Sequence, residues 1–339
     1  MNLIPESNGL YKVKKDGKFR NITKTKYVLI LFLVIIVIAF LTQQVSNFIG
    51  NEKIKIHLNY AKVENKKLEY TLKGEGDYTV VFLGATGANL CEWDNTAKLV
   101  REQLNLKTFV YNRNGYGFSD ISTIRTPKEQ AEDLKILLRK AGVSGNLILV
   151  GEEYGSLILT NFVQSYPDSV KGVVLVDPYD EEKIKGEDFN KKITNIYNKS
   201  KIETIGCYFY LTSLLDKMNK TYKVNGFEEA LDEDELEEFN IQKNKKNYRQ
   251  AIEYEFKNLK DYSESSQENG MLSDKPLFIV SKTDEISLTR LGSEELTNTY
   301  TVSDSDGLLS TNSSETIYNA ISTVHKTAKK LLKKKISKF

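Results

Sequence analysis

The chain has 339 residues, of which 40% are hydrophobic and 28% are charged, as in an ordinary globular protein. Its formal net charge of +2 conceals an asymmetry, because residues 1–26 contain seven Lys or Arg against only Glu6 and Asp16. The remainder is therefore mildly acidic and gives no sign of the basic patch that a nucleic-acid-binding domain needs, so no nucleic-acid partner is expected.

Residues 27–45 read YVLILFLVIIVIAFLTQQV and predict a transmembrane helix, since about 20 apolar residues cross a bilayer. A buried core helix is one alternative, but the run has no polar stripe. A cleaved signal peptide is another, but its basic region would be unusually long and no clear small-residue cleavage site follows. We therefore expect a single-pass signal anchor in the cell membrane. The basic flank places residues 1–26 in the cytoplasm and the rest of the chain outside it.

Beyond the anchor, hydrophobic periodicity predicts alternating strands and helices. Strands are expected at 53–60, 67–73, 78–84, 107–112, 146–151, 170–177, 276–281 and 299–303. Helices are expected at 94–104, 126–141, 154–166, near 287–298, and from about 314 to the end. Strands that alternate with helices of this length form a mostly parallel, doubly wound sheet, so the fold class is α/β.

The charged, mostly helical stretch 178–272 interrupts this alternation. We expect it to be a lid or cap inserted into a core made of residues 51–177 and 273–339. The two cysteines, Cys91 and Cys207, are too few for a disulfide framework. One bridge between them and two free, packed thiols are both compatible with the sequence.

Five segments carry a family resemblance. They are VVFLGATGANLCEW (80–93), YNRNGYGFSD (111–120), RTPKEQAEDLKILLRKAGV (125–143), LILVGEEYGS (147–156) and YPDSVKGVVLVDP (166–178). In order and spacing they resemble a bacterial branch of the α/β-hydrolase superfamily, here with a membrane anchor. The resemblance implies an α/β-hydrolase fold with a helical lid and a nucleophile on a tight turn between a strand and a helix.

The catalytic positions of the family are altered. Gly151 and Gly155 match the glycines of the nucleophile turn, but Glu153 occupies the centre, where the family has Ser. Glu152 replaces the usual preceding His. The resemblance places the catalytic histidine at position 307, which is Gly307 here. It places the triad acid at Asp284.

The chain contains only two histidines, His57 and His325, and neither lies at the family position. A serine nucleophile needs an adjacent base, and the same histidine later protonates the leaving group. Dehalogenase and epoxide-hydrolase relatives place Asp at the turn, but they still use a histidine to activate water. Glu153 is therefore disfavoured as a nucleophile.

Other roles remain for these carboxylates. Gly84, Ala85, Thr86 and Tyr154 mark the region where the family binds an oxyanion, and with Glu152 they are candidate ligand-binding residues. The Glu153 carboxylate would be held there by backbone amides at a helix N-terminus. A second hypothesis has Glu152, Glu153, Asp284, Asp304 and Asp306 converging on a cation or an amine, and a third has these acids merely solvated.

The sequence thus predicts a catalytically degenerate pseudohydrolase that acts outside the cytoplasm as a binding or regulatory module. Its partners would be the membrane, through residues 27–45, and an unknown small-molecule ligand or protein. No cofactor and no dedicated metal site are expected. The alternative is an active hydrolase of esters or amides with an unorthodox site centred on Glu153.

Overall fold

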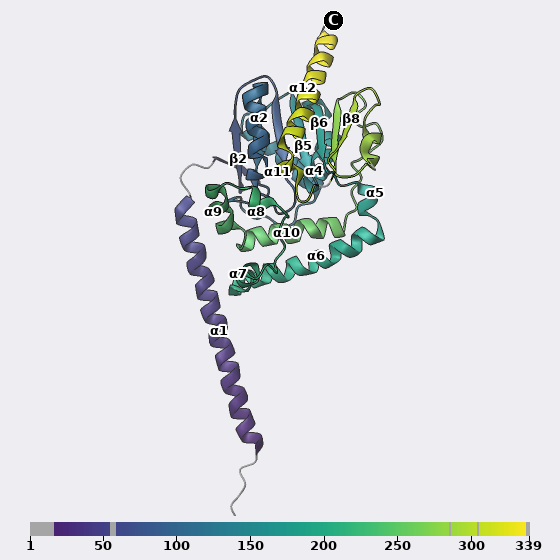
Figure 1. Ribbon diagram of the computed structural model, residues 1–339. Coiled ribbons are helices and arrows are strands. Elements are labelled where there is room, and N and C mark those ends of the chain that lie inside the picture. Colours follow the sequence, from purple (N-terminus) through teal and green to yellow (C-terminus); the bar gives the residue numbers. More distant parts are fainter. Residues whose placement is uncertain (1–16, 55–58, 285, 304, 337–339) are drawn as a thin grey trace, which may run out of the picture.

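The computed structural model describes residues 17–54, 59–284, 286–303 and 305–336 (Figure 1). Eight strands form one sheet in the order β1-β2-β4-β3-β5-β6-β7-β8. They are β1 (Asn59–Val63), β2 (Lys66–Lys73), β3 (Thr79–Leu83), β4 (Lys107–Tyr111), β5 (Leu147–Glu152), β6 (Val170–Val176), β7 (Leu277–Ser281) and β8 (Thr297–Thr301). Strand β2 is antiparallel to both of its neighbours, and all pairs from β4 to β8 are parallel.

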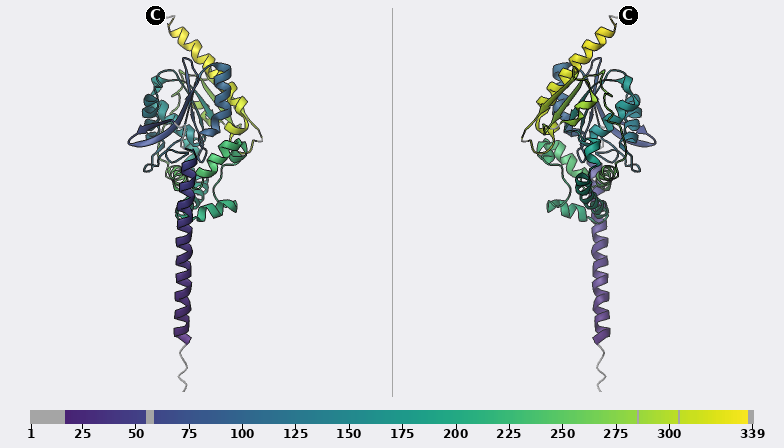
Figure 2. Two further views of the ribbon diagram at one scale, coloured as in Figure 1. Left: turned by 90° about the vertical axis from the view of Figure 1, so that its left-hand side faces the viewer. Right: turned by 90° about the vertical axis from the view of Figure 1, so that its right-hand side faces the viewer.

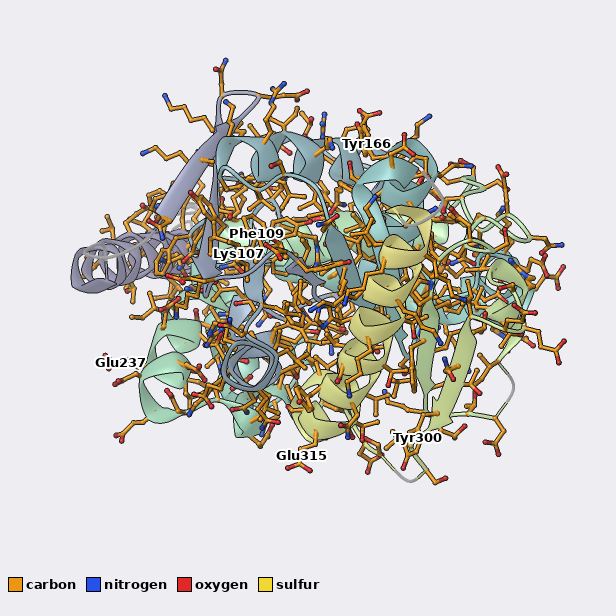
Figure 3. The ribbon with its side chains drawn as sticks, turned by 90° about the horizontal axis from the view of Figure 1, so that it is seen from above. Lys107, Phe109, Tyr166, Glu237, Tyr300 and Glu315 are labelled. Atoms are coloured by element: carbon orange, nitrogen blue, oxygen red, sulfur yellow. The ribbon has the colours of Figure 1, made fainter. Side chains whose placement is uncertain are left out.

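The central strands β3 and β5 are buried at every residue, as expected for parallel strands covered on both faces. Their register aligns Leu83 with Gly151. The segments that follow the two strands therefore emerge side by side at the carboxyl edge of the sheet, where α/β folds place their ligand sites. Seen from above, Phe109 of β4 lies inside the fold, whereas Tyr300 projects outward from the edge strand β8 (Figure 3).

Helices cover both faces of the sheet. The helices α2 (Asp94–Leu104) and α12 (Ser314–Ile336) pack on one face, and α3 (Pro127–Lys140) and α4 (Tyr154–Ser165) pack on the other. The apolar side chains of α12 that face the sheet are buried at Ile317, Ala320, Ile321, Val324 and Ala328. Two apolar layers thus hold the sheet between them.

Between β6 and β7 the chain is mostly helical. Its elements are α5 (Glu181–Ile184), α6 (Glu187–Gly206), the 3-10 turn η3 (Cys207–Phe209), α7 (Leu211–Lys217), α8 (Phe227–Ala230), α9 (Glu233–Gln242) and α10 (Lys246–Lys260). Helices α6 and α10 pack against each other. Figure 1 shows this group below the sheet, on the side where β3 and β5 end.

Helix α1 (Gly17–Ile54) contains the apolar stretch Lys24–Val45, which is long and apolar enough to cross a membrane. It extends away from the sheet, while the C-terminal end of α12 lies at the opposite end of the molecule (Figures 1 and 2). Helix α1 packs against η3 and α9.

Two expected elements are wrong. Lys53 and Ile54, the start of the expected first strand, belong to α1, because the helix continues past its apolar run, and β1 begins only at Asn59. The helix expected near 287–298 is a single 3-10 turn, η4 (Ser287–Leu291), followed by extended Gly292. A short helix, α11 (Leu309–Asn312), was not predicted. Cys91 and Cys207 are both free thiols.

Candidate functional site

The turn from β5 into α4 has the geometry of a nucleophile elbow. Glu153, at its centre, has φ 44° and ψ −111°, a strained conformation for a residue with a side chain. A Cβ on Gly155 would lie 2.3 Å from the carbonyl oxygen of Leu83, and one on Gly151 would lie 2.9 Å from that of Gly155. Only glycine permits this close approach of α4 to β3, so the two glycines fix the turn.

Glu153 is partly buried among other charged groups. Its side chain makes a hydrogen bond with Tyr179 and makes none with the amides at the start of α4. Burial, and then the charge of Glu152, raises the pKa of Glu153 to about 8, against the lowering effects of Lys282 and of the Tyr179 hydrogen bond. The neutral acid therefore predominates near neutral pH. The hypothesis that amides of the α4 N-terminus hold a Glu153 carboxylate is wrong.

Glu152 is fully buried and points toward the segment after β8. Its two carboxylate oxygens accept hydrogen bonds from the amides of Leu309, at 2.6 Å, and Ser310, at 3.1 Å. Burial raises its pKa, although these hydrogen bonds oppose the shift. Glu152 thus joins the elbow to α11.

Sequence reasoning missed the role of Glu92. Its two carboxylate oxygens lie 3.2 and 3.0 Å from the amide nitrogen of Ala85, which donates to them, and the side chains of Glu92 and Glu152 hydrogen-bond each other. Burial, and then the charge of Glu152, raises the pKa of Glu92 well above its ordinary value. A proton shared between the two carboxyls satisfies both, because two adjacent buried charges would repel. The Ala85 amide, in the expected oxyanion region, is therefore bound to Glu92.

Glu255 on α10 was also missed, because it lies far away in the sequence. It forms a bidentate ion pair with Arg113, at 2.7 and 3.0 Å, and both side chains are buried. Arg113 in turn donates to the carbonyl oxygens of Gly84 and Ala85. The Thr86 hydroxyl donates to Glu255 at 2.8 Å. These bonds thus link the expected oxyanion segment to α10, one of the helices between β6 and β7.

The position expected for the family histidine is covered. Gly307 has φ +78°, and an added Cβ would lie 2.3 Å from the carbonyl oxygen of Asn225, in the connection between α7 and α8. His325 packs edge-to-face against Tyr78 at 4.9 Å, near the amino end of β3 and not at the elbow. Burial lowers its pKa. His57 lies outside the described residues.

The structure places Asp177, rather than Asp284, beside the elbow. Asp177 pairs with Lys282 at 2.9 Å, and both charges influence the pKa of Glu153. Asp284 is exposed in the loop after β7, and its role as a triad acid stays a prediction.

The expected convergence of five acids on a cation is not found among the described residues. Among the described residues, the side chains close enough to share an ion are Cys91, Asp94 and Glu235, and none of the expected acids belongs to this group. Asp306 is exposed and Asp304 lies outside the described residues.

A cavity of about 190 Å³ opens beside Asp177 and Tyr179. Its wall is polar at Asp180, Ser281 and Thr283 and includes apolar side chains such as Phe189 and Ile279. This combination suits a small ligand with one polar end.

Comparison with known proteins agrees with this geometry. Residues 78–200 match the family described as alpha/beta hydrolase fold. The chain is 32% identical over 100 residues to the Alpha/beta hydrolase domain-containing protein VTE7 of Arabidopsis thaliana, covering 29% of this chain and 30% of that protein. It is 29% identical over 107 residues to the Uncharacterized protein YqjL of Bacillus subtilis (strain 168), covering 31% and 42%. The chain thus spans less than half the length of these relatives.

Solved structures extend the likeness over most of the chain. The Cif epoxide hydrolase from Acinetobacter nosocomialis aligns with a TM-score of 0.64 at 15% identity, covering 83% of this chain and 96% of that one. MGS-M2, an alpha/beta hydrolase enzyme from a deep-sea metagenome library, aligns with a TM-score of 0.57 at 17% identity, covering 78% and 96%. At these identities the likeness shows the fold alone.

We predict that Glu153 makes the free energy of unfolding fall as the pH rises. The pKa of Glu153 is about 8 in the folded chain, against about 4.3 for an unfolded glutamate. Between these values the folded state binds the extra proton, so stability is greatest at low pH and is lost as the pH rises through about 8. Glu153→Gln cannot ionise and should flatten part of this decline.

The measurement is guanidinium unfolding of the full chain in detergent at about pH 5, 7 and 9, followed by the fluorescence of Trp93, the only tryptophan and a buried one. Asp284→Asn is measured beside it as the control, because it removes one carboxylate from an exposed loop. An unaltered slope in Glu153→Gln would contradict the raised pKa.

A second prediction concerns the ion pair between Arg113 and Glu255. Glu255→Ala leaves a buried guanidinium without its carboxylate, which should lower the free energy of unfolding by about 3–5 kcal/mol. Glu253→Ala, on the same helix, should change it by less than about 0.5 kcal/mol. The same fluorescence assay compares the two variants. An effect of Glu255→Ala as small as that of Glu253→Ala would show that the ion pair contributes little to stability.

Proposed function

We propose that this chain, whose residues 78–200 match the family described as alpha/beta hydrolase fold, is a membrane-anchored pseudohydrolase that binds a ligand or partner at the elbow and does not hydrolyse it. The observation that carries the proposal is the replacement of both reacting groups of the triad. Glu153 stands at the nucleophile position, and Gly307, covered by Asn225, stands at the position of the base.

The chemistry of the elbow supports this proposal. A carboxyl nucleophile must be ionised to attack and needs a base to activate water afterwards. Glu153, with its pKa raised to about 8 by burial and then by Glu152, is mostly neutral near pH 7. No histidine lies at the elbow among the described residues, since His325 packs against Tyr78. The Ala85 amide is bound to Glu92, which weakens its use as an oxyanion donor.

A neutral carboxyl at this position suits binding. A neutral Glu153 has a hydroxyl that can donate a hydrogen bond to a ligand, and the ion pair of Asp177 and Lys282 beside it supplies both an acceptor and a donor. The cavity next to Asp177 and Tyr179 holds a small molecule with one polar end, or a side chain of a protein partner. Five residues would form the inner wall of this site: Gly84, Ala85, Thr86, Glu152 and Tyr154. Asp284, in the loop after β7, would lie at its edge.

The anchor defines where the module works. Residues 27–45 would remain in the cell membrane as a single span, with residues 1–26 in the cytoplasm because of their seven basic side chains. The core of residues 51–177 and 273–339 would then face outward. The helices of residues 178–272 would form a lid, which Glu255 and Asn225 support by covering the expected oxyanion and histidine positions.

A second candidate is an active hydrolase centred on Glu153, and one observation favours it. The elbow keeps its strained φ of 44° at Glu153 even though the residue is no longer serine. Strained backbone is concentrated at functional sites.

Turnover by the purified full chain separates the two candidates. We expect no hydrolysis of esters, amides or epoxides above a buffer blank, and no difference between the wild type and Glu153→Ala. Turnover that Glu153→Ala abolishes and the control Glu132→Gln, at an exposed site on α3, retains would establish the active hydrolase instead. Weak turnover that survives Glu153→Ala would be residual catalysis by the binding contacts, which supplies about 10³–10⁴-fold over water in a serine protease.

Restoring the triad with Glu153→Ser and Gly307→His is not a clean control. A side chain at position 307 meets the carbonyl oxygen of Asn225 and must adopt a positive φ. An inactive double variant would therefore report strain as readily as the absence of a substrate.

A further inference from the structure

Exposed large hydrophobic side chains outside α1 are concentrated in one short segment. Among the described residues there are nine of them, and seven lie between positions 202 and 218. We call these seven the η3–α7 face; they are Ile202, Ile205, Tyr208, Phe209, Leu211, Leu214 and Met218. Isolated exposed hydrophobics are common, but a contiguous group marks an interaction surface.

The position of α1 indicates what covers this face. Helix α1 packs against η3, and Gln43 of α1 is only 4% exposed. Gln43 lies two residues before the end of the apolar stretch Lys24–Val45, which is about 3 Å along a helix at 1.5 Å per residue. Figure 1 shows α7, which directly follows η3, beside the C-terminal half of α1, the half that contains Gln43 and the end of the apolar stretch.

The orientation of the helices agrees. Helices α6 and α7 lie on the side of the domain toward the N-terminal part of α1, with the C-terminus at the opposite end (Figures 1 and 2). A bilayer crossed by α1 would thus meet these helices before any other part of the fold. Aromatic side chains such as Tyr208 and Phe209 are typical of the region between lipid headgroups and acyl chains.

The charges around the face match an anionic lipid surface. The exposed charged side chains between positions 199 and 220 are all lysines, namely Lys199, Lys201, Lys217 and Lys220. The two acids of this stretch are buried: Glu203 pairs with Arg249 at 3.1 Å, and Asp216 pairs with Lys243 at 3.4 Å. Apolar and aromatic residues with a rim of lysines are the signature of an interfacial helix.

We infer that the η3–α7 face rests in the interfacial layer of the same bilayer that α1 crosses, so that the domain has a second, monotopic contact with lipid. This inference depends on α1 spanning the membrane, as in the proposed function. It does not depend on whether the elbow is catalytic.

The test uses environment-sensitive labels on the full chain, reconstituted in vesicles of phosphatidylcholine and phosphatidylglycerol. In a background of Cys91→Ala and Cys207→Ala, Leu214→Cys is labelled with a nitrobenzoxadiazole fluorophore. Lipids with a shallow spin label should quench it several-fold more than they quench the control Glu132→Cys, an exposed site on α3. The emission of the Leu214→Cys label should also be shifted to the blue.

Two results would overturn the inference. If the emission of the label at position 214 shows the same exposure to water as that of the control, the face does not touch lipid. If the emission is shifted to the blue but shallow spin-labelled lipids do not quench it, protein covers the face, for example a second copy of the chain. A third label at Ile35→Cys, inside the apolar stretch, tests the anchor separately: if deep spin labels do not quench it, α1 does not span the bilayer.

Discussion

The close backbone approach between β3 and the start of α4 determines how the rest of the site is built. Gly155 lets α4 begin directly behind Leu83, and the turn that results forces Glu153 to a positive φ. Because this constraint concerns the backbone, it survives the replacement of the nucleophile. The fold therefore presents the residue at position 153 at the carboxyl edge of the sheet whatever its side chain. Its chemistry is then decided by its neighbours.

The groups around position 153 stabilise several carboxyls that lie close together and are largely shielded from water. Isolated buried carboxylates are very unfavourable, so each needs a proton, an amide or a cation. Glu92 and Glu152 share a hydrogen bond. They also accept hydrogen bonds from the backbone amides of Ala85, Leu309 and Ser310. Glu255 takes the guanidinium of Arg113. Glu153 has no amide or direct ion pair among the described contacts, and burial, followed by the charge of Glu152, therefore raises its pKa.

Sequence reasoning succeeded where the signal is local. Buried strands such as β3 and β5 are continuous apolar runs, and the elbow follows from Gly151 and Gly155, which a tight strand-to-helix turn requires. It failed where the signal is distant: Glu255 reaches Arg113 across 142 positions, and nothing in the local pattern of α10 indicates that pairing. The role of Glu92 was hidden for a different reason, since a glutamate next to buried Trp93 is equally compatible with a solvated helix start. The helix expected near 287–298 failed because an extended Gly292 and β8 divide that stretch.

The connection from α7 to α8 links the two regions for which we propose functions. It begins at the η3–α7 face, and Tyr222 and Val224 then lie against Gly87 while Asn225 covers Gly307. Arg249 holds this connection in place, since it donates to the carbonyl oxygen of Tyr222 and pairs with Glu203 of α6. The segment that would rest on the lipid is thus continuous with the segment that lies against Gly87 and Gly307. Movement of η3 and α7 within the bilayer surface would therefore act first on the covering of positions 87 and 307, and only through them on Glu153.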